Sequence, residues 1–282
     1  MRSTSRARRV LAALAASALL LTGTLGAASA AHAAPAPAQI TRMAALGDSI
    51  TQAAMTCTSL TSCPANSWST GSTASVNSHL LRLRAAGAAS LVGTNNAVSG
   101  EGSSALLRQA QAAMAQQAQY VTIEIGAIDA CTKTVATMTP TTTFKTNVQS
   151  ALAALAAGPA SPEIFVASIP SLQRLYELNR TSLSARLAWA LLGTCQSMLA
   201  NPSSTRPADV RRRLDVQKRV NEFNQALFDA CTATPKCRFD GFAVANYAFT
   251  KSDLSTRDYF HPSLTGQATL AALTWPRTQW AS

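Results

Sequence analysis

Three residues of this sequence, Ser49, Asp258 and His261, have side chains suited to nucleophilic catalysis. Ser49 follows Gly47-Asp48 at the end of a short apolar run, and a serine on a tight strand-to-helix turn is exposed enough to act as a nucleophile. A serine needs a base to take its proton, and histidine is the usual one. Asp258 lies three residues before His261, so its carboxylate can accept the ring N–H and fix the tautomer.

Each of these features also has a structural explanation. Gly-Asp-Ser occurs in turns where the serine caps a helix, and a histidine just before a helix can be an ordinary surface residue. His79 lies on an apolar helical stretch with no acid nearby in sequence, and we expect it to be structural. Few histidines and no cysteine pair of the CxxC kind leave little material for a metal site, so no metal and no other cofactor is expected.

Residues 1–34 have the pattern of a secretory signal peptide. Four arginines precede an uncharged apolar run that begins at Val10, and small residues follow, ending in Ala31-His32-Ala33-Ala34. The apolar run is shorter than the roughly 20 residues that a membrane-spanning helix needs. We therefore expect a leader over residues 1–34, a folded domain over residues 35–282, and a secreted, extracellular protein.

Removal of this leader changes the charge balance. It leaves 20 basic residues against 13 acidic ones, a formal net charge of +7. This charge favours anionic surfaces. With 47% hydrophobic and 13% charged residues, the chain can bury a core and does not have the composition of a disordered protein.

The six cysteines favour disulfides, because an exported protein meets an oxidising compartment. Six cysteines can pair in many ways. The spacing favours two short loops, Cys57–Cys63 and Cys231–Cys237, which leaves Cys131–Cys195 as the long link.

Predicted strands and helices alternate along the chain. The strands are expected at residues 43–46, 91–98, 120–125 and 163–169, and the helices at residues 76–83, 104–118, 142–157, 172–199 and 208–230. Alternation of this kind implies parallel pairing with helices on both faces of one sheet. We expect one α/β domain, and its active site at the carboxyl ends of the strands. Ser49, Gly100 and Asp129 each follow a predicted strand and should lie along one edge.

Two segments could be mistaken for functional sites. Leu183, Leu187, Leu191 and Cys195 recur every four residues; this segment could line an acyl-chain pocket or act as a lid, but the spacing favours a core helix. Arg211-Arg212-Arg213 is flanked by acids and has no interleaved aromatics, which indicates a solvated helix face and no nucleic-acid site.

The chain resembles the GDSL, or SGNH, family of serine esterases and lipases, especially the secreted actinomycete lipases with three disulfides. Four blocks occur in the family's order: Gly47-Asp48-Ser49-Ile50, Ser99-Gly100, Gly126-Ala127-Ile128-Asp129 and Asp258-x-x-His261. The resemblance covers nearly all of residues 35–282. It implies a single three-layer α/β/α domain with a mainly parallel sheet.

The resemblance also implies roles for individual residues. Ser49 would attack the ester carbonyl, His261 would remove and return the proton, and Asp258 would orient His261. The oxyanion would be held by the backbone N–H groups of Ser49 and Gly100. The family's third donor is an asparagine side chain, and the matching position here is Ile128.

Ile128 departs from the family pattern in the oxyanion hole. Loss of one oxyanion donor lowers turnover by roughly 10²–10³. Three accounts are open: a weak enzyme with two backbone donors, an inactive relative kept for binding, or a replacement donor such as Asn96. Asp129 cannot replace the donor while ionised, since a carboxylate only accepts hydrogen bonds.

The sequence thus predicts a secreted serine hydrolase of carboxylic esters, of lipid or short-chain acyl type, impaired by Ile128. The alternative from a different class is a catalytically inactive binding protein on the same scaffold. A peptidase uses similar residues but matches this order of blocks poorly. We expect a monomer whose partners are an ester substrate and, transiently, an anionic lipid surface.

Overall fold

The structure is a computed structural model that describes residues 33–281. The predicted leader at residues 1–34 falls almost wholly outside the described residues. Within the described part of the chain, none of the helices combines the length and the apolar character that crossing a membrane requires.

The domain is built on a single five-stranded sheet, as predicted for an α/β protein. The strands are β1 (Arg42–Gly47), β2 (Val92–Asn95), β3 (Tyr120–Glu124), β4 (Glu163–Val166) and β5 (Cys237–Phe239). They run in the spatial order β2-β1-β3-β4-β5, and every neighbouring pair is parallel. All carboxyl ends therefore lie at one edge of the sheet, where polar residues that follow the strands can meet.

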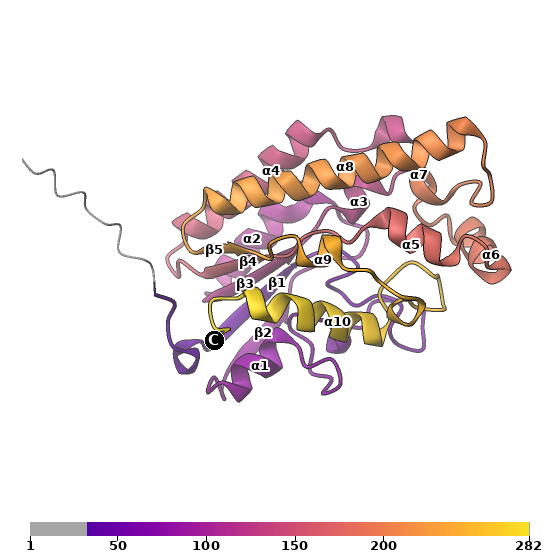
Figure 1. Cartoon of the computed structure of the whole chain (residues 1–282). Helices are drawn as coiled ribbons and strands as arrows, with labels where there is room; N and C mark the ends of the chain where they lie inside the picture. The colour runs from indigo at the N-terminus through magenta and orange to yellow at the C-terminus, as the bar shows by residue number, and fades with distance from the viewer. Residues whose placement is uncertain (1–32, 282) are drawn as a thin grey trace, which may run out of the picture. The chain divides into compact units, whose positions relative to one another are not determined.

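Helices cover both faces of this sheet, so its central strands are buried on both sides (Figure 1). One layer holds α2 (Leu106–Ala115), α4 (Thr141–Ala157) and α8 (Pro207–Thr232), which pack side by side. The opposite layer holds α1 (His79–Ala85) and α10 (Leu264–Thr274). This is the predicted three-layer α/β/α arrangement.

The single long helix predicted at residues 172–199 is wrong. The segment forms three helices, α5 (Leu172–Asn179), α6 (Leu183–Leu192) and α7 (Gln196–Leu199). Ser182 caps α6 by accepting a hydrogen bond from the Ala185 N–H, and Gly193 ends it in the left-handed region at φ +62°. Both signals are local ones that outweigh the continuous apolar pattern.

The prediction that the leucines of this segment face the core is also wrong. Leu183, Leu187 and Leu191 are 63%, 62% and 85% exposed. The buried face of α6 is formed instead by Ala185 and Trp189. A four-residue repeat places side chains on one face of a helix, but it does not determine which way that face points.

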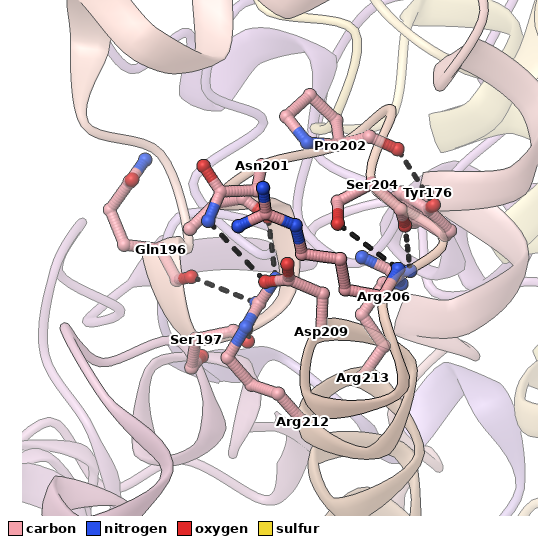
Figure 2. A network of polar contacts seen from close by, with 11 residues as sticks. Tyr176, Gln196, Ser197, Asn201, Pro202, Ser204, Arg206, Asp209, Arg212 and Arg213 are labelled. Carbon is pink, nitrogen blue, oxygen red and sulfur yellow. Dashed lines mark hydrogen bonds and ion pairs between the residues drawn. The ribbon is translucent and has the colours of Figure 1, made fainter.

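The arginine run is not the solvated face that the sequence predicts. Arg213 is only 4% exposed, donates to the Ser204 carbonyl at 2.7 Å and lies over the Tyr176 ring at 4.8 Å. Arg212 donates to the carbonyls of Gln196 and Ser197 (Figure 2). Two of the three arginines therefore fasten the segment after α6 to the start of α8.

Of the three disulfides, two close short loops and one joins segments 64 residues apart in the sequence. They are the pairs favoured by the sequence, Cys57–Cys63, Cys131–Cys195 and Cys231–Cys237. Cys131 follows the short helix α3 (Ala127–Ala130), so the long link ties the carboxyl end of β3 to the segment after α6. The third disulfide ties the end of α8 to β5, a three-residue strand that the sequence did not reveal.

The end of β1 requires a glycine. Gly47 has φ +144°, and a Cβ there would lie 2.1 Å from the Glu124 carbonyl oxygen on β3. We expect Gly47→Ala to lower the free energy of unfolding by about 2 kcal/mol or more, because backbone strain alone is worth about 1–3 kcal/mol. In a domain of this size the melting temperature should fall by about 4 °C or more.

Gly193→Ala is the matched control, since Gly193 also has a positive φ but nothing lies within 4 Å of its added Cβ. Its melting temperature should fall clearly less. Equal stability of Gly47→Ala and the parent would contradict the proposed close approach of β1 to β3.

Candidate active site

The candidate nucleophile lies on the turn that follows β1. The Asp48 carboxylate accepts the N–H of Ile50, two residues further along, at 2.9 Å, and this bond closes a tight turn around Ser49. Ser49 is 6% exposed, and its hydroxyl faces the cleft described below. The local sequence therefore places a serine hydroxyl at the carboxyl edge of the sheet.

Two buried glutamines, which the sequence analysis missed, hold this turn. Gln109 on α2 accepts the Gly47 N–H at 2.8 Å and donates to the Gly47 carbonyl at 3.0 Å. Gln267 on α10 donates to the Ile50 carbonyl at 2.8 Å and accepts the Trp68 N–H at 2.9 Å. Gln109 could have been recognised, because it lies on the apolar face of α2.

His261 is in hydrogen-bond contact with both other candidate residues. Its Nε2 lies 2.8 Å from the Ser49 Oγ, and its Nδ1 lies 2.5 Å from the Asp258 Oδ2. The other oxygen of Asp258 accepts the backbone N–H groups of Phe260 and His261, both at 3.1 Å. The carboxylate is only 1% exposed. The backbone from Asp258 to His261 thus forms a turn that directs the His261 ring toward Ser49.

The environment of His261 favours its charged form. Burial lowers the pKa of His261, but the hydrogen bond to Asp258 and the negative charges of Asp258 and Asp48 outweigh burial, and the net shift is upward. The ring therefore loses its proton at a higher pH than an ordinary histidine.

A group of buried carboxyls lies behind the nucleophile. Burial raises the pKa of Asp48 to about 7, although the Ile50 N–H and the charge of His261 lower it. Burial, with the nearby charges of Asp48 and Asp240, raises the pKa of Glu124 well above its usual range. Asp48 and Glu124 lie close to the candidate nucleophile in the fold but do not line the cleft.

The candidate catalytic residues open into a cleft of about 670 Å³. Its walls come from the turn after β1, the loop between Cys57 and Cys63, the segments after β2 and β3, the segment after α6, and the loop before α10. Its lining side chains are mostly apolar and include Met55, Leu60, Ile128, Leu192 and Phe260. A cleft of this kind suits an acyl group with a few polar contacts at one end.

Two backbone N–H groups at the cleft are free to receive an oxyanion. Among the described residues, neither Ser49 nor Gly100 donates its backbone N–H to an internal acceptor. Gly100 has φ +87° and lies with Ser49 in the cleft wall. Ile128 lines the same cleft and has no donor in its side chain.

The structure does not support Asn96 as a replacement donor. Its side-chain amide exchanges two hydrogen bonds with the Gln116 amide, at 2.9 and 3.0 Å, and it does not line the cleft. Asp129, which was expected along the same edge, is directed elsewhere and accepts the Ser103 N–H and hydroxyl at 2.8 and 2.7 Å. Ser49 and Gly100 therefore meet in the cleft, whereas Asp129 supports the loop after β2.

His79 is separate from this site. It is fully buried, its two ring nitrogens contact the Tyr120 hydroxyl at 2.7 Å and the Thr274 hydroxyl at 2.8 Å, and burial lowers its pKa to about 3. This is the structural histidine that the sequence analysis expected.

A comparison with known protein families finds a match over most of the domain. A model of the GDSL-like Lipase/Acylhydrolase family matches residues 45–269, which include Ser49 and His261. The chain belongs to this family. No curated protein matches the GDSL-like chain in sequence.

Solved structures share the fold of this GDSL-like domain. LAE5, an alpha/beta hydrolase from the metagenome of Lake Arreo in Spain, is 16% identical, with a TM-score of 0.54 over 86% of this chain and 96% of its own. The lipase Lip_vut3 from a goat rumen metagenome is 14% identical, with a TM-score of 0.53 over 82% and 94%. An acetylxylan esterase from Geobacillus stearothermophilus, solved as a catalytic mutant, is 13% identical, with a TM-score of 0.50 over 86% and 95%.

The raised pKa of His261 gives a prediction for the pH dependence of any esterase activity. Only the neutral ring can accept the Ser49 proton, so kcat/KM should rise with pH and its midpoint should lie above the ordinary value of 6.5. A profile that is flat from pH 5 to 8 would contradict a role for His261 as base.

Asp258→Asn should lower kcat by about 10⁴-fold, the effect of losing the partner that orients such a histidine.

The two hydrogen bonds between Gln109 and Gly47 give a second prediction. Gln109→Leu leaves the buried Gly47 N–H without its side-chain partner, while the Gly47 carbonyl keeps the Val98 N–H at 3.1 Å, and one such unsatisfied group is worth about 1–3 kcal/mol. Thermal or urea unfolding should show a clear loss of stability, while Gln225→Leu on the exposed face of α8 should show little change. Equal effects of the two substitutions would show that the hydrogen bonds of Gln109 to Gly47 make no specific contribution to stability.

Proposed function

We propose that the protein is a secreted serine hydrolase that cleaves carboxylic esters through Ser49, His261 and Asp258. The observation that carries this proposal is the continuous hydrogen-bond chain from the Ser49 Oγ through the His261 ring to a buried carboxylate, at 2.8 and 2.5 Å. Its serine end opens into an apolar cleft. Membership of the GDSL-like family supports the same chemistry.

The proposed reaction proceeds through an acyl-enzyme. The Ser49 oxygen bonds to the ester carbonyl carbon while its proton moves to the His261 Nε2. The ester C–O bond then breaks, and His261 returns this proton to the departing alcohol. Water next attacks the acyl group, His261 takes a proton from the water, and the acid leaves as the Ser49 hydroxyl is restored. Protein groups and water supply every proton in these steps, so the proposed steps require no metal or cofactor.

Ile128 limits this reaction in our proposal. Negative charge develops on the carbonyl oxygen, and the Ser49 and Gly100 N–H groups can stabilise it. A third donor is missing because Ile128 occupies the position of the family's asparagine. We expect turnover to be roughly 10²–10³ lower than with that donor present.

The cleft favours acyl esters as substrates, either lipids or short-chain esters. Its apolar walls can surround an acyl chain, whereas few charged side chains face it. We further propose that residues 1–34 direct export, that the three disulfides form outside the cytoplasm, and that the protein acts as a monomer.

The second candidate function is binding without catalysis on the same scaffold. The absence of a donor at Ile128 favours this alternative, and the intact contacts of Ser49, His261 and Asp258 favour the enzyme.

Hydrolysis of p-nitrophenyl butyrate by four purified proteins separates the two functions. The parent should exceed Ser49→Ala, and Ile128→Asn should raise kcat by roughly 10²–10³ because it restores a donor. Ile128→Val is the matched control; it relieves bulk without adding a donor and should not reproduce the gain. If the parent equals Ser49→Ala and Ile128→Asn is active, Ile128 has switched the site off and binding becomes the natural role. If no variant hydrolyses esters of any chain length, the esterase proposal is wrong.

A further inference from the structure

The exposed face of α6 carries an unusual apolar surface. Leu183, Leu187 and Leu191, which we call the α6 stripe, follow one another at four-residue spacing on one side of the helix. Their exposed fractions of 63%, 62% and 85% exceed those of most large apolar side chains in the described residues. Isolated exposed leucines are common, but a continuous row of them marks an interaction site.

The α6 stripe is continuous with the candidate active-site cleft. Leu192, which follows Leu191 directly, is 40% exposed and lines the cleft together with Ser49. Leu60 is 53% exposed and lines the cleft from the Cys57–Cys63 loop, a different wall segment. A partner that covers the stripe would therefore also cover the entrance to the nucleophile.

The α6 stripe is held in place at both ends of its helix. Ser182 caps the start of α6, and Cys195, three residues after its end, is bonded to Cys131 beside the cleft. Arg212 and Arg213 fasten the segment that follows, and the Tyr176 hydroxyl donates to the Pro202 carbonyl at 2.8 Å (Figure 2). The surface is thus presented by a fastened helix whose leucines find no cover within the domain.

The chain segment that contains the α6 stripe carries only basic charges. Between Leu178 and Ala208 the chain has three arginines and no acidic residue. A hollow of about 360 Å³ shares Met55 with the cleft, and its charged lining residues are Lys251 and Arg257, both exposed. Apolar side chains combined with cations are the composition of a surface that binds anionic lipid.

We infer that the α6 stripe docks the protein on a lipid surface that carries anionic head groups, with the cleft entrance facing the lipid. Leucines of the stripe enter the acyl boundary, and the cations around the cleft contact the head groups. This inference rests on the proposed function for its purpose, since docking brings an acyl ester to Ser49. The docking step itself does not require catalysis.

The test measures binding to vesicles in the Ser49→Ala background, where no hydrolysis can occur. Sedimentation with phosphatidylcholine vesicles containing phosphatidylglycerol is compared for Ser49→Ala alone and with Leu187→Ser and Leu191→Ser added. We expect the two added substitutions to weaken binding by at least about tenfold, which corresponds to about 1.4 kcal/mol. Binding of the Ser49→Ala protein should be weaker to vesicles without phosphatidylglycerol and should fall at high salt.

Val92→Ser in the Ser49→Ala background is the matched control. Val92 is 60% exposed but begins β2, at the opposite edge of the sheet from the cleft, so its substitution should leave binding unchanged. In the Ser49 background, Leu187→Ser with Leu191→Ser should leave hydrolysis of soluble p-nitrophenyl butyrate unchanged. A protein that hydrolyses this ester but does not bind vesicles overturns the docking proposal alone.

Three further results would overturn the inference. The first is vesicle binding that the two leucine substitutions do not weaken. The second is equal binding to vesicles with and without the anionic lipid. The third is a dimer in light scattering that becomes a monomer on substitution of the two leucines, because the stripe would then bind a second copy of the chain.

Discussion

The candidate site depends on a backbone that leaves the sheet at Gly47, where there is no room for a side chain. The end of β1 lies against the Glu124 carbonyl of β3 so closely that any Cβ would overlap it. Gln109 and Gln267 then fix the turn from two opposite helical layers. The position of the Ser49 hydroxyl therefore depends on the packing of the whole domain, because the three constraints on the turn come from β3, α2 and α10.

Burial and close charges together determine the electrostatics of the candidate site. Asp258 is enclosed, and its carboxylate accepts three hydrogen bonds, two from backbone N–H groups and one from the His261 ring. Asp48 lies close enough to add to the field that favours a protonated ring. Such a site can stabilise the imidazolium that would form if His261 took the Ser49 proton. It contrasts with the wall of the cleft at Ile128, whose side chain has no polar atom.

Local sequence patterns predicted much of this arrangement. Strand ends marked by Gly47 and Gly126, and the short separation of Asp258 from His261, are local signals. They located the first four strands, and the structure brings Asp258, His261 and Ser49 together. Cysteine spacing predicted the disulfide pairs that the structure contains. What depends on distant partners could not be predicted in this way. The Asn96 amide is hydrogen-bonded to Gln116, and α6 buries the side that carries Trp189 while its leucines are exposed.

The arginine run and the helix at residues 172–199 show the same limit. Arg213 has the composition of a surface residue but is buried against Tyr176 and the Ser204 carbonyl, which only the fold brings near. The caps at Ser182 and Gly193 were visible in the sequence, but the apolar run around them masked their meaning.

The central claim, that Ser49 is a nucleophile activated by His261, is tested most directly by covalent labelling with a serine-directed phosphonate and mass spectrometry of the peptides. The account predicts one phosphonyl group on Ser49, no label in Ser49→Ala, and much slower labelling in folded His261→Ala. Unlabelled Ser49 in the folded parent, or a label on another residue, would contradict it.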